Sequence, residues 1–327
     1  MNFRNISAFL GLSFTISGGA FFFARQLELD DMFSLGLLIL FTVLQLWGPG
    51  IAAMIVQKWI KKGNMKELGY RSGKLDVKWL IGSALAPIVA LFGTIAVVYI
   101  AGNLLGFDSF GRVDLTATAA YTSQLFEHWN SNSFVLQNLS VLWNDASELF
   151  YIFADAGKWG NFIQMFLLFT AVGATLLVPF MLGEEMGFRG FLLKETQSLG
   201  FLGSGLVVGI AWGVWALIPF MMIGYWDFPI MLSALGGCIA LSYVLSFLSL
   251  KTGSLFAPAA FRGVLSLYGA LMGFFVVSGE GHINGITGLA GSILFLFITY
   301  LILINGKDFV EKFPSLSYLP EQKEEAE

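Results

Sequence analysis

The apolar runs of this sequence constrain its fold most, because several of them reach about 20 residues, the length that a helix needs to cross a lipid bilayer. Charged residues make up only 12% of the 327 residues, roughly half of their share in soluble domains. We therefore predict an all-α polytopic membrane protein in which residues 1–306 form a single transmembrane domain. The eight predicted spans are residues 7–25, 33–56, 79–104, 162–182, 203–224, 230–249, 254–277 and 285–305.

A cleaved signal peptide is the alternative interpretation of the first run, with Arg4 as its basic segment. Charged residues follow from Arg25 onward without a convincing cleavage site, which favours an uncleaved first span. The single Cys238 lies inside an apolar run, so the sequence indicates no disulfide framework. The net charge is −4 and the sequence has no basic stripe, so we expect no nucleic-acid partner.

Positive charge is concentrated in the connection between the second and third predicted spans. Short loops rich in Lys and Arg remain in the cytoplasm, so this connection predicts that both termini are inside. Contact with anionic lipids is compatible with that topology. We therefore expect an integral protein of a prokaryotic cytoplasmic membrane. The basic residues of the connection are Lys58, Lys61, Lys62, Lys66, Arg71, Lys74 and Lys78, whereas the outer loops keep only Arg25, Arg112 and Lys158.

The longest predicted connection, residues 105–161, lies on the outer side. Within it, the sequence Asp145-Ala146-Ser147-Glu148 resembles a capping box ahead of an apolar stretch. We expect a helix there that lies on the outer membrane interface or dips into it. The C-terminal tail, residues 307–327, is acidic and poor in apolar residues towards its end, so we expect a disordered cytoplasmic segment.

Two adjacent carboxylates, Glu184 and Glu185, follow the fourth predicted span. Ionisable side chains at the edge of a membrane span are costly and usually serve a function. Like charges side by side also oppose each other's ionisation, which favours one of them as a proton acceptor near neutral pH. Arg189 is four residues after Glu185, so the two can pair on one helix face while Glu184 points elsewhere. The simpler alternative is a helix end whose acids face water, with Arg189 as a snorkelling anchor.

The stretch Glu184-Glu185-Met186-Gly187-Phe188-Arg189 resembles the first motif, Glu-Glu-x-x-x-Arg, of the CAAX prenyl endopeptidases and their bacterial relatives, the CPBP intramembrane proteases. The similarity covers roughly residues 160–280, with a weaker fit at residues 50–53. It implies that Glu184, alone or with Glu185, activates a water molecule that attacks a peptide carbonyl within the membrane. It also implies a membrane-anchored or lipidated peptide as substrate.

The other two family motifs match in frame but lack their histidines. The second motif places a His four residues after an aromatic residue; Trp212 fits the aromatic position, and Ala216 stands in the His position. The third motif is a His followed four residues later by Asn, and these positions hold Arg262 and Ser266. Arg262 lies inside an apolar run, so we predict that it pairs with one of the two glutamates. The alternatives are that it reaches a lipid headgroup or a water-filled cavity.

Both histidines of the chain, His128 and His282, are predicted on the outer side, across the membrane from Glu184. The sequence has no His-Glu-x-x-His motif and no Cys–His cluster at the spacing of zinc ligands. The resemblance leaves a divalent metal open as a cofactor, but the histidines that would bind it are missing. We therefore name no definite cofactor.

The resemblance implies that the motif His and Asn stabilise the oxyanion or deliver a proton. Their substitution predicts a poor protease or an inactive one, since loss of one oxyanion donor costs ~100- to 1000-fold in rate. An arginine paired with a glutamate would also occupy the catalytic base. The sequence leaves two origins open: a natural pseudoenzyme, or an active parent altered at Ala216 and Arg262. Two other function classes remain, a catalytically silent binding or scaffold protein and, more distantly, a small-molecule transporter. No pair of spans shows the internal symmetry that transporters of this kind usually have.

Overall fold

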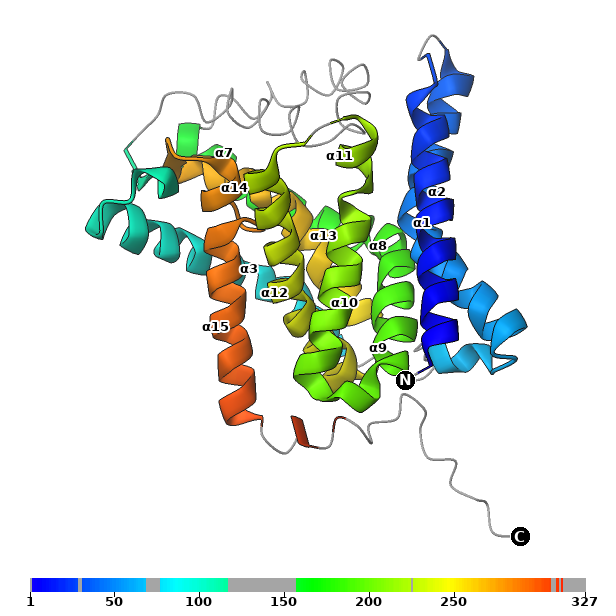
Figure 1. The fold of residues 1–327 in the computed structure, drawn as a ribbon. Helices are drawn as coiled ribbons and strands as arrows, with labels where there is room; N and C mark the ends of the chain where they lie inside the picture. Colours follow the sequence, from blue (N-terminus) through cyan, green and yellow to red (C-terminus); the bar gives the residue numbers. More distant parts are fainter. Residues whose placement is uncertain are drawn as a thin grey trace.

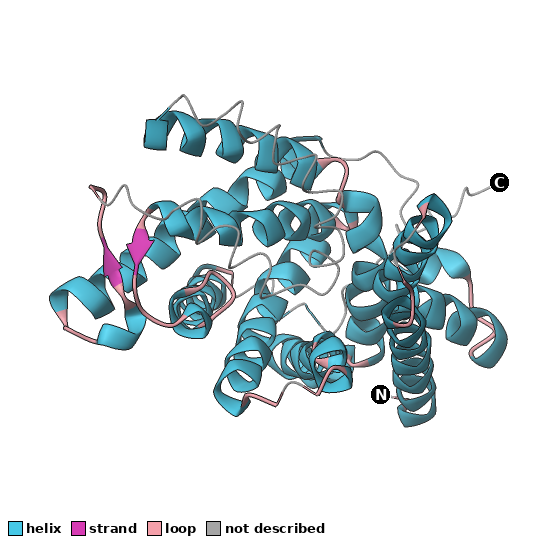
Figure 2. Ribbon diagram, turned by 90° about the horizontal axis from the view of Figure 1, so that it is seen from above, coloured by secondary structure: helices cyan, strands magenta, loops and turns pink. Residues whose placement is uncertain are grey.

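The computed structural model describes residues 2–28, 31–68, 77–116, 157–224, 226–306, 310–311 and 313. Long helices dominate it (Figure 1), and the described residues form one two-stranded antiparallel sheet, in which β1 (Arg112–Val113) pairs with β2 (Val276–Val277) (Figure 2). The predicted all-α membrane fold is thereby confirmed. The main helices are α1 (Phe3–Arg25), α2 (Met32–Ile55), α3 (Val77–Val98), α7 (Gly157–Ala174), α8 (Val178–Glu185), α9 (Leu193–Glu195), α10 (Gly200–Ala216), α11 (Ile218–Met222), α12 (Phe228–Thr252), α13 (Phe256–Leu271), α14 (Gly281–Asn284) and α15 (Leu289–Asn305).

Three of these helices continue without a break into π-helical segments. The segments are η1 (Val56–Ile60) after α2, η3 (Tyr99–Leu104) after α3 and η5 (Met186–Leu192), which joins α8 to α9. Short 3₁₀ turns complete the described connections: η2 (Met65–Leu68), η4 (Asp108–Phe110), η6 (Gln197–Leu199) and η7 (Met272–Phe274).

Fewer helices are long enough to span a membrane than the sequence predicts. Within the described residues six helices have the length and apolar composition, or seven if α7 and the helix after it, bent by 52°, form one broken span. One difference from the predicted eight lies in residues 162–182, which are divided between α7 and α8, and the other lies in residues 254–277. There α13 has only 16 residues, which rise roughly 24 Å, less than the bilayer core of about 30 Å. The apolar run then continues as η7 and β2, so apolar composition alone overestimated the helix.

The helices alternate in direction, and the start of α1 and the end of α15 lie on the same side of the bundle (Figure 1). We call this the inner side, and it also carries the ends of α9 and α12. This arrangement matches the alternation expected for two cytoplasmic termini. The capping-box segment and His128, residues 69–76 of the basic connection and most of the C-terminal tail lie outside the described residues.

Glycines allow α10 and α12 to pack closely. Gly205, Gly209 and Gly213 repeat every four residues on one face of α10, and an added Cβ would contact Tyr243, Ile239 and Leu235 of α12, respectively. Small residues at this spacing let two helix backbones approach in a membrane. Because this face of α10 has no side chains at the three glycines, α12 can lie close to the α10 backbone.

The helix that carries the two glutamates packs in the same way against α2. A Cβ on Gly183 would lie 2.6 Å from Cα of Trp47, and one on Gly187 would lie 2.7 Å from the carbonyl carbon of Pro49. The indole Nε1 of Trp47 also donates to the carbonyl oxygen of Pro179 at 3.0 Å. We call the continuous helix formed by α8, η5 and α9 the motif helix. The stretch of α2 from Trp47 to Gly50 packs against one face of it.

Candidate active site

The two glutamates are the last residues of α8, and both are buried, with exposed fractions of 1% for Glu184 and 0% for Glu185. The helix continues as η5, which carries the equally buried Arg189. A π-helical turn inside a helix is rare and often occurs at a functional site. The alternative of a helix end with acids in bulk water is therefore wrong, because neither acid reaches the surface.

Glu185 pairs with Arg189, as the four-residue spacing predicts. Arg189 Nη1 donates to Glu185 Oε1 at 3.4 Å, and both side chains are fully buried. The other carboxylate oxygen, Oε2, is buried and has no hydrogen-bond partner among the described residues. Buried ions need complete pairing to be stable, so this half-satisfied carboxylate is an energetically demanding feature.

Glu184 is the acceptor for two donors from two other helices. Trp212 Nε1 of α10 and Arg262 Nη2 of α13 each lie 3.0 Å from Glu184 Oε2. The predicted pairing of Arg262 with a glutamate is confirmed, and the partner is Glu184. The sequence could not show which glutamate Arg262 contacts, because this depends on how α10 and α13 pack around Glu184.

The indole ring of Trp212 joins the two ion pairs. The guanidinium carbons of Arg189 and Arg262 lie 4.4 and 4.5 Å from the ring centroid, within the range of a cation–π contact. Trp212 itself is 1% exposed. One aromatic side chain therefore contacts both cations and donates to one anion, and the site is a buried cluster of two carboxylates, two guanidinium groups and an indole.

Two further motif positions make no polar contact with this cluster. Ala216 is the last residue of α10, one turn after Trp212, and it packs partly buried against the apolar core. Ser266 is exposed, and its hydroxyl donates to the Gly263 carbonyl of its own helix at 2.8 Å. The structure thus brings together Glu184, Trp212 and Arg262, whereas Ser266 faces away.

His282 is far from this cluster in the fold. It belongs to α14 on the side opposite the inner side (Figure 1), and its Nε2 lies 3.4 Å from the Glu280 carboxylate. Cys238 of α12, in contrast, lies within electrostatic reach of Arg262, Arg189 and Glu184. Sequence reasoning did not find Cys238 as a neighbour, because it is one of many small residues within an apolar run.

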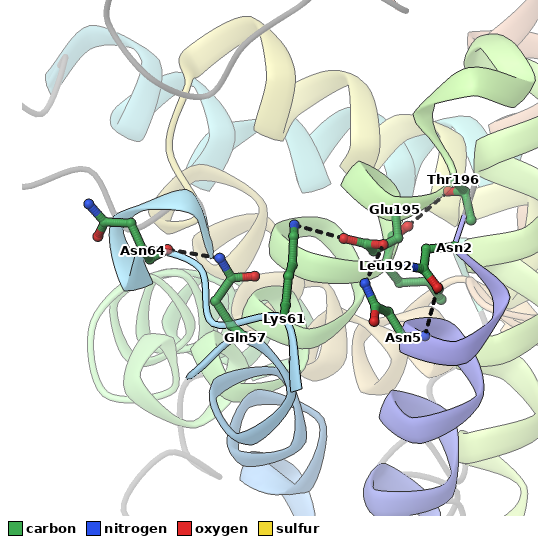
Figure 3. A network of polar contacts seen from close by, with 8 residues as sticks. All are labelled: Asn2, Asn5, Gln57, Lys61, Asn64, Leu192, Glu195 and Thr196. Carbon is green, nitrogen blue, oxygen red and sulfur yellow. Dashed lines mark hydrogen bonds and ion pairs between the residues drawn. The ribbon is translucent and has the colours of Figure 1, made fainter. Parts of the chain in front are cut away.

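A second polar cluster lies at the inner end of the motif helix (Figure 3). Glu195 accepts from Lys61 Nζ at 2.9 Å and from Asn5 Nδ2 at 3.3 Å, which ties α1 and η1 to the end of α9. The Glu195 side chain is only 8% exposed. The sequence analysis did not single out Glu195, although it follows Arg189 by six residues on the same continuous helix.

The donor set of the buried cluster does not fit a divalent metal. Its two carboxylates already accept from guanidinium groups, whose positive charge would repel a cation at the same oxygens. The described residues contain no group of three or more His, Cys, Asp or Glu side chains that could hold a metal ion. No step below is therefore assigned to a metal.

Comparison with known proteins identifies the region that contains this cluster. Residues 161–268 match the family model of the type II CAAX prenyl endopeptidases of the Rce1-like group. No curated protein matches the chain as a close relative. The matched region runs from α7 into α13 and contains every residue of the cluster. Over these residues, about a third of the chain, the protein is similar to the type II CAAX prenyl endopeptidases of the Rce1-like group.

Proposed function

We propose that this protein is a CAAX-type intramembrane endopeptidase in architecture whose catalytic acid, Glu184, is held inactive by Arg262. The observation that carries the proposal is the 3.0 Å contact from Arg262 Nη2 to Glu184 Oε2. In this proposal the protein keeps a site for a membrane-anchored or lipidated peptide but hydrolyses it slowly or not at all.

The hydrogen bonds of Glu184 interfere with its use as a general base. A carboxylate that activates water has to accept a hydrogen bond from that water and then take its proton. Glu184 Oε2 already accepts from Trp212 and Arg262, and charge-assisted hydrogen bonds of this kind are among the strongest in proteins. The two donors therefore occupy the oxygen Oε2, which is not free to accept a hydrogen bond from a substrate water.

The site also lacks a hydrogen-bond donor at position 216. Alanine at position 216 has no group that could donate a hydrogen bond to a developing oxyanion. Its place on α10, one turn from Trp212, is where a His side chain would be directed along the same helix face. Loss of one oxyanion donor lowers a rate ~100- to 1000-fold. Ala216 and Arg262 therefore each reduce activity by a separate mechanism.

Cleavage of a farnesylated CAAX peptide by the purified protein in liposomes tests this proposal. The matched variant is Glu184→Ala, which removes the proposed base. We expect slow cleavage or none by the unaltered protein and none by Glu184→Ala. Rapid cleavage by the unaltered protein that disappears in Glu184→Ala would overturn the proposal.

A binding role without catalysis is the second candidate, and the exposure of Arg262 favours it. The Arg262 side chain is 17% exposed, although its partner Glu184 is only 2% exposed. Arg262 thus has the most exposed side chain of the cluster, and a peptide that enters the site would meet it first. Binding of the same peptide that is retained in Glu184→Gln and weakened in Arg262→Gln would support this role, and the reverse result would exclude it.

A further inference from the structure

Three serines on α12 have an unusual environment. Ser242, Ser246 and Ser249 are each 0% exposed. Their hydroxyl groups have no hydrogen-bond partner within the part of the chain that the structure describes. Buried hydroxyl groups are normally hydrogen-bonded, and a bare one in a membrane protein is costly. These three side chains therefore require partners that are not protein groups of the described residues.

Ser13 of α1 and Ser83 of α3 are also buried without a described partner, but each is the only such serine on its helix, whereas α12 carries three. Several other hydroxyl groups bond within their own helix. Thr42, Thr94, Thr299 and Ser292 each donate to the carbonyl oxygen four residues earlier, at distances of 2.7 or 2.8 Å. This back-bond is the usual way in which a helix satisfies a Ser or Thr side chain inside a membrane. The three serines of α12 have rotamers that do not make it, so their hydroxyl groups point towards something else.

The spacing of the serines places them on one face of α12. Separations of four and three residues keep side chains on the same side of a helix, and Cys238, four residues before Ser242, extends the row. Cys238 lies within electrostatic reach of the ion cluster. At the other end, α12 ends at Thr252 on the inner side of the bundle (Figure 1). The row therefore runs from the inner side to the cluster.

Helix α10 faces part of this row with glycines, which offer the row no side-chain hydrogen-bond partner. An added Cβ on Gly209 would lie 3.2 Å from Cβ of Ser242, and one on Gly213 would lie 3.2 Å from Cβ of Cys238. These glycines have no side chain that could accept or donate. The ion cluster supplies a further buried atom without a described partner, Glu185 Oε2.

We propose that Ser242, Ser246 and Ser249 bind a file of ordered water molecules that connects the inner side of the membrane to the Glu184–Glu185 cluster. Buried waters typically make about three hydrogen bonds to polar groups that would otherwise have no partner, and the three hydroxyl groups with Glu185 Oε2 provide such a series. The file brings water and protons to the cluster. The existence of the file does not rest on the proposed function.

The test compares thiol exchange at two buried serine positions. Cys238 is the single cysteine of the chain, so Cys238→Ala gives a background without thiols. Ser246→Cys then places one thiol in the file. Ser292→Cys, the matched control, places one on α15, where the hydroxyl already has a partner. Infrared spectroscopy in D₂O follows conversion of S–H to S–D, and thermal unfolding confirms that both variants are folded.

The exposure of the two side chains and the proposed water file predict opposite orders of thiol exchange at positions 246 and 292. Ser246 is 0% exposed and Ser292 is 7% exposed, so exposure alone predicts that the thiol at 292 exchanges first. The file predicts that the thiol at 246 exchanges first, by about tenfold or more, because a hydrogen-bonded water lies beside it. Equal rates, or faster exchange at 292, would overturn the proposal.

If either variant does not fold, a structure of the unaltered protein at a resolution that shows ordered water decides. Density beside the three hydroxyl groups supports the file, and its absence overturns it. Neither readout depends on peptide cleavage.

Discussion

Arg262 on α13 donates through Nη2 to Oε2 of Glu184, 78 residues earlier in the chain, at 3.0 Å. The contact joins the third-motif position to the first-motif acid and crosses the ring of Trp212 from the second motif. All three motif helices therefore converge on one carboxylate. A buried ion pair is a weak source of stability but costs a great deal when one partner is removed.

Removal of the Arg262 side chain should therefore destabilise the protein. Arg262→Ala leaves the buried Glu184 carboxylate with Trp212 as its remaining described partner, and we expect the free energy of unfolding to fall by about 3 kcal/mol. Denaturant titration in mixed micelles measures this change. Ser266→Ala is the control, because Ser266 lies one turn further on α13 and is exposed. A loss of similar size in both variants would contradict the importance of the ion pair.

Two substitutions at Trp212 should separate its hydrogen bond from its ring. Trp212→Phe keeps an aromatic ring near both guanidinium groups but loses the Nε1 donor to Glu184, and we expect a loss of about 2 kcal/mol, typical of a hydrogen bond to a charged group. Trp212→Ala also loses the ring, and about 4 kcal/mol is expected. The same micelle titration compares them. Equal losses in the two variants would show that the cation–π contacts contribute nothing measurable.

The second polar cluster should couple the first two helices to the motif helix. Glu195→Ala removes the partner of Lys61 and Asn5 (Figure 3), and we expect the free energy of unfolding to fall by about 2 kcal/mol. Limited proteolysis should also cut η1 more readily. Lys62→Ala, an exposed neighbour, serves as control and should change stability by less than about 0.5 kcal/mol. An unchanged Glu195→Ala protein would exclude this coupling.

A single methyl group at Gly187 should displace α2. Its Cβ would lie 2.7 Å from the carbonyl carbon of Pro49, closer than real contacts allow, so Gly187→Ala should cost about 1–3 kcal/mol. Gly82→Ala on α3 is the matched control, because its Cβ would meet nothing within 4 Å. There the better helix propensity of alanine predicts a gain of up to about 1 kcal/mol. Thermal unfolding distinguishes the two, and a gain in both would refute the close packing.

Sequence patterns predicted the fold class and the members of the cluster because both depend on local signals. Apolar runs of bilayer length indicate membrane helices, and the four-residue spacing of Glu185 and Arg189 fixes a shared helix face. The charge of Arg262 in an apolar run required a buried partner, and the available acids were few. Each of these inferences needs only the chemistry of a side chain and its place on one helix.

Features that depend on how helices pack could not be predicted in this way. Whether Arg262 pairs with Glu184 or Glu185 is decided by the position of α13, and Ser266 faces away for the same reason. The run 254–277 is mostly apolar, yet its last residues form a strand edge that pairs with β1. Glu195 and Cys238 gained their roles only from neighbours distant in sequence.

The central claim is that Arg262 and Ala216 silence the site around Glu184. Its most direct test is the rate of farnesylated CAAX peptide cleavage by the Ala216→His, Arg262→His double variant, compared with the unaltered protein and with the double variant that also carries Glu184→Ala. We predict cleavage in the double variant alone, faster than the unaltered protein by about 100-fold or more. A double variant as inactive as the unaltered protein, or one whose activity survives Glu184→Ala, would contradict the claim.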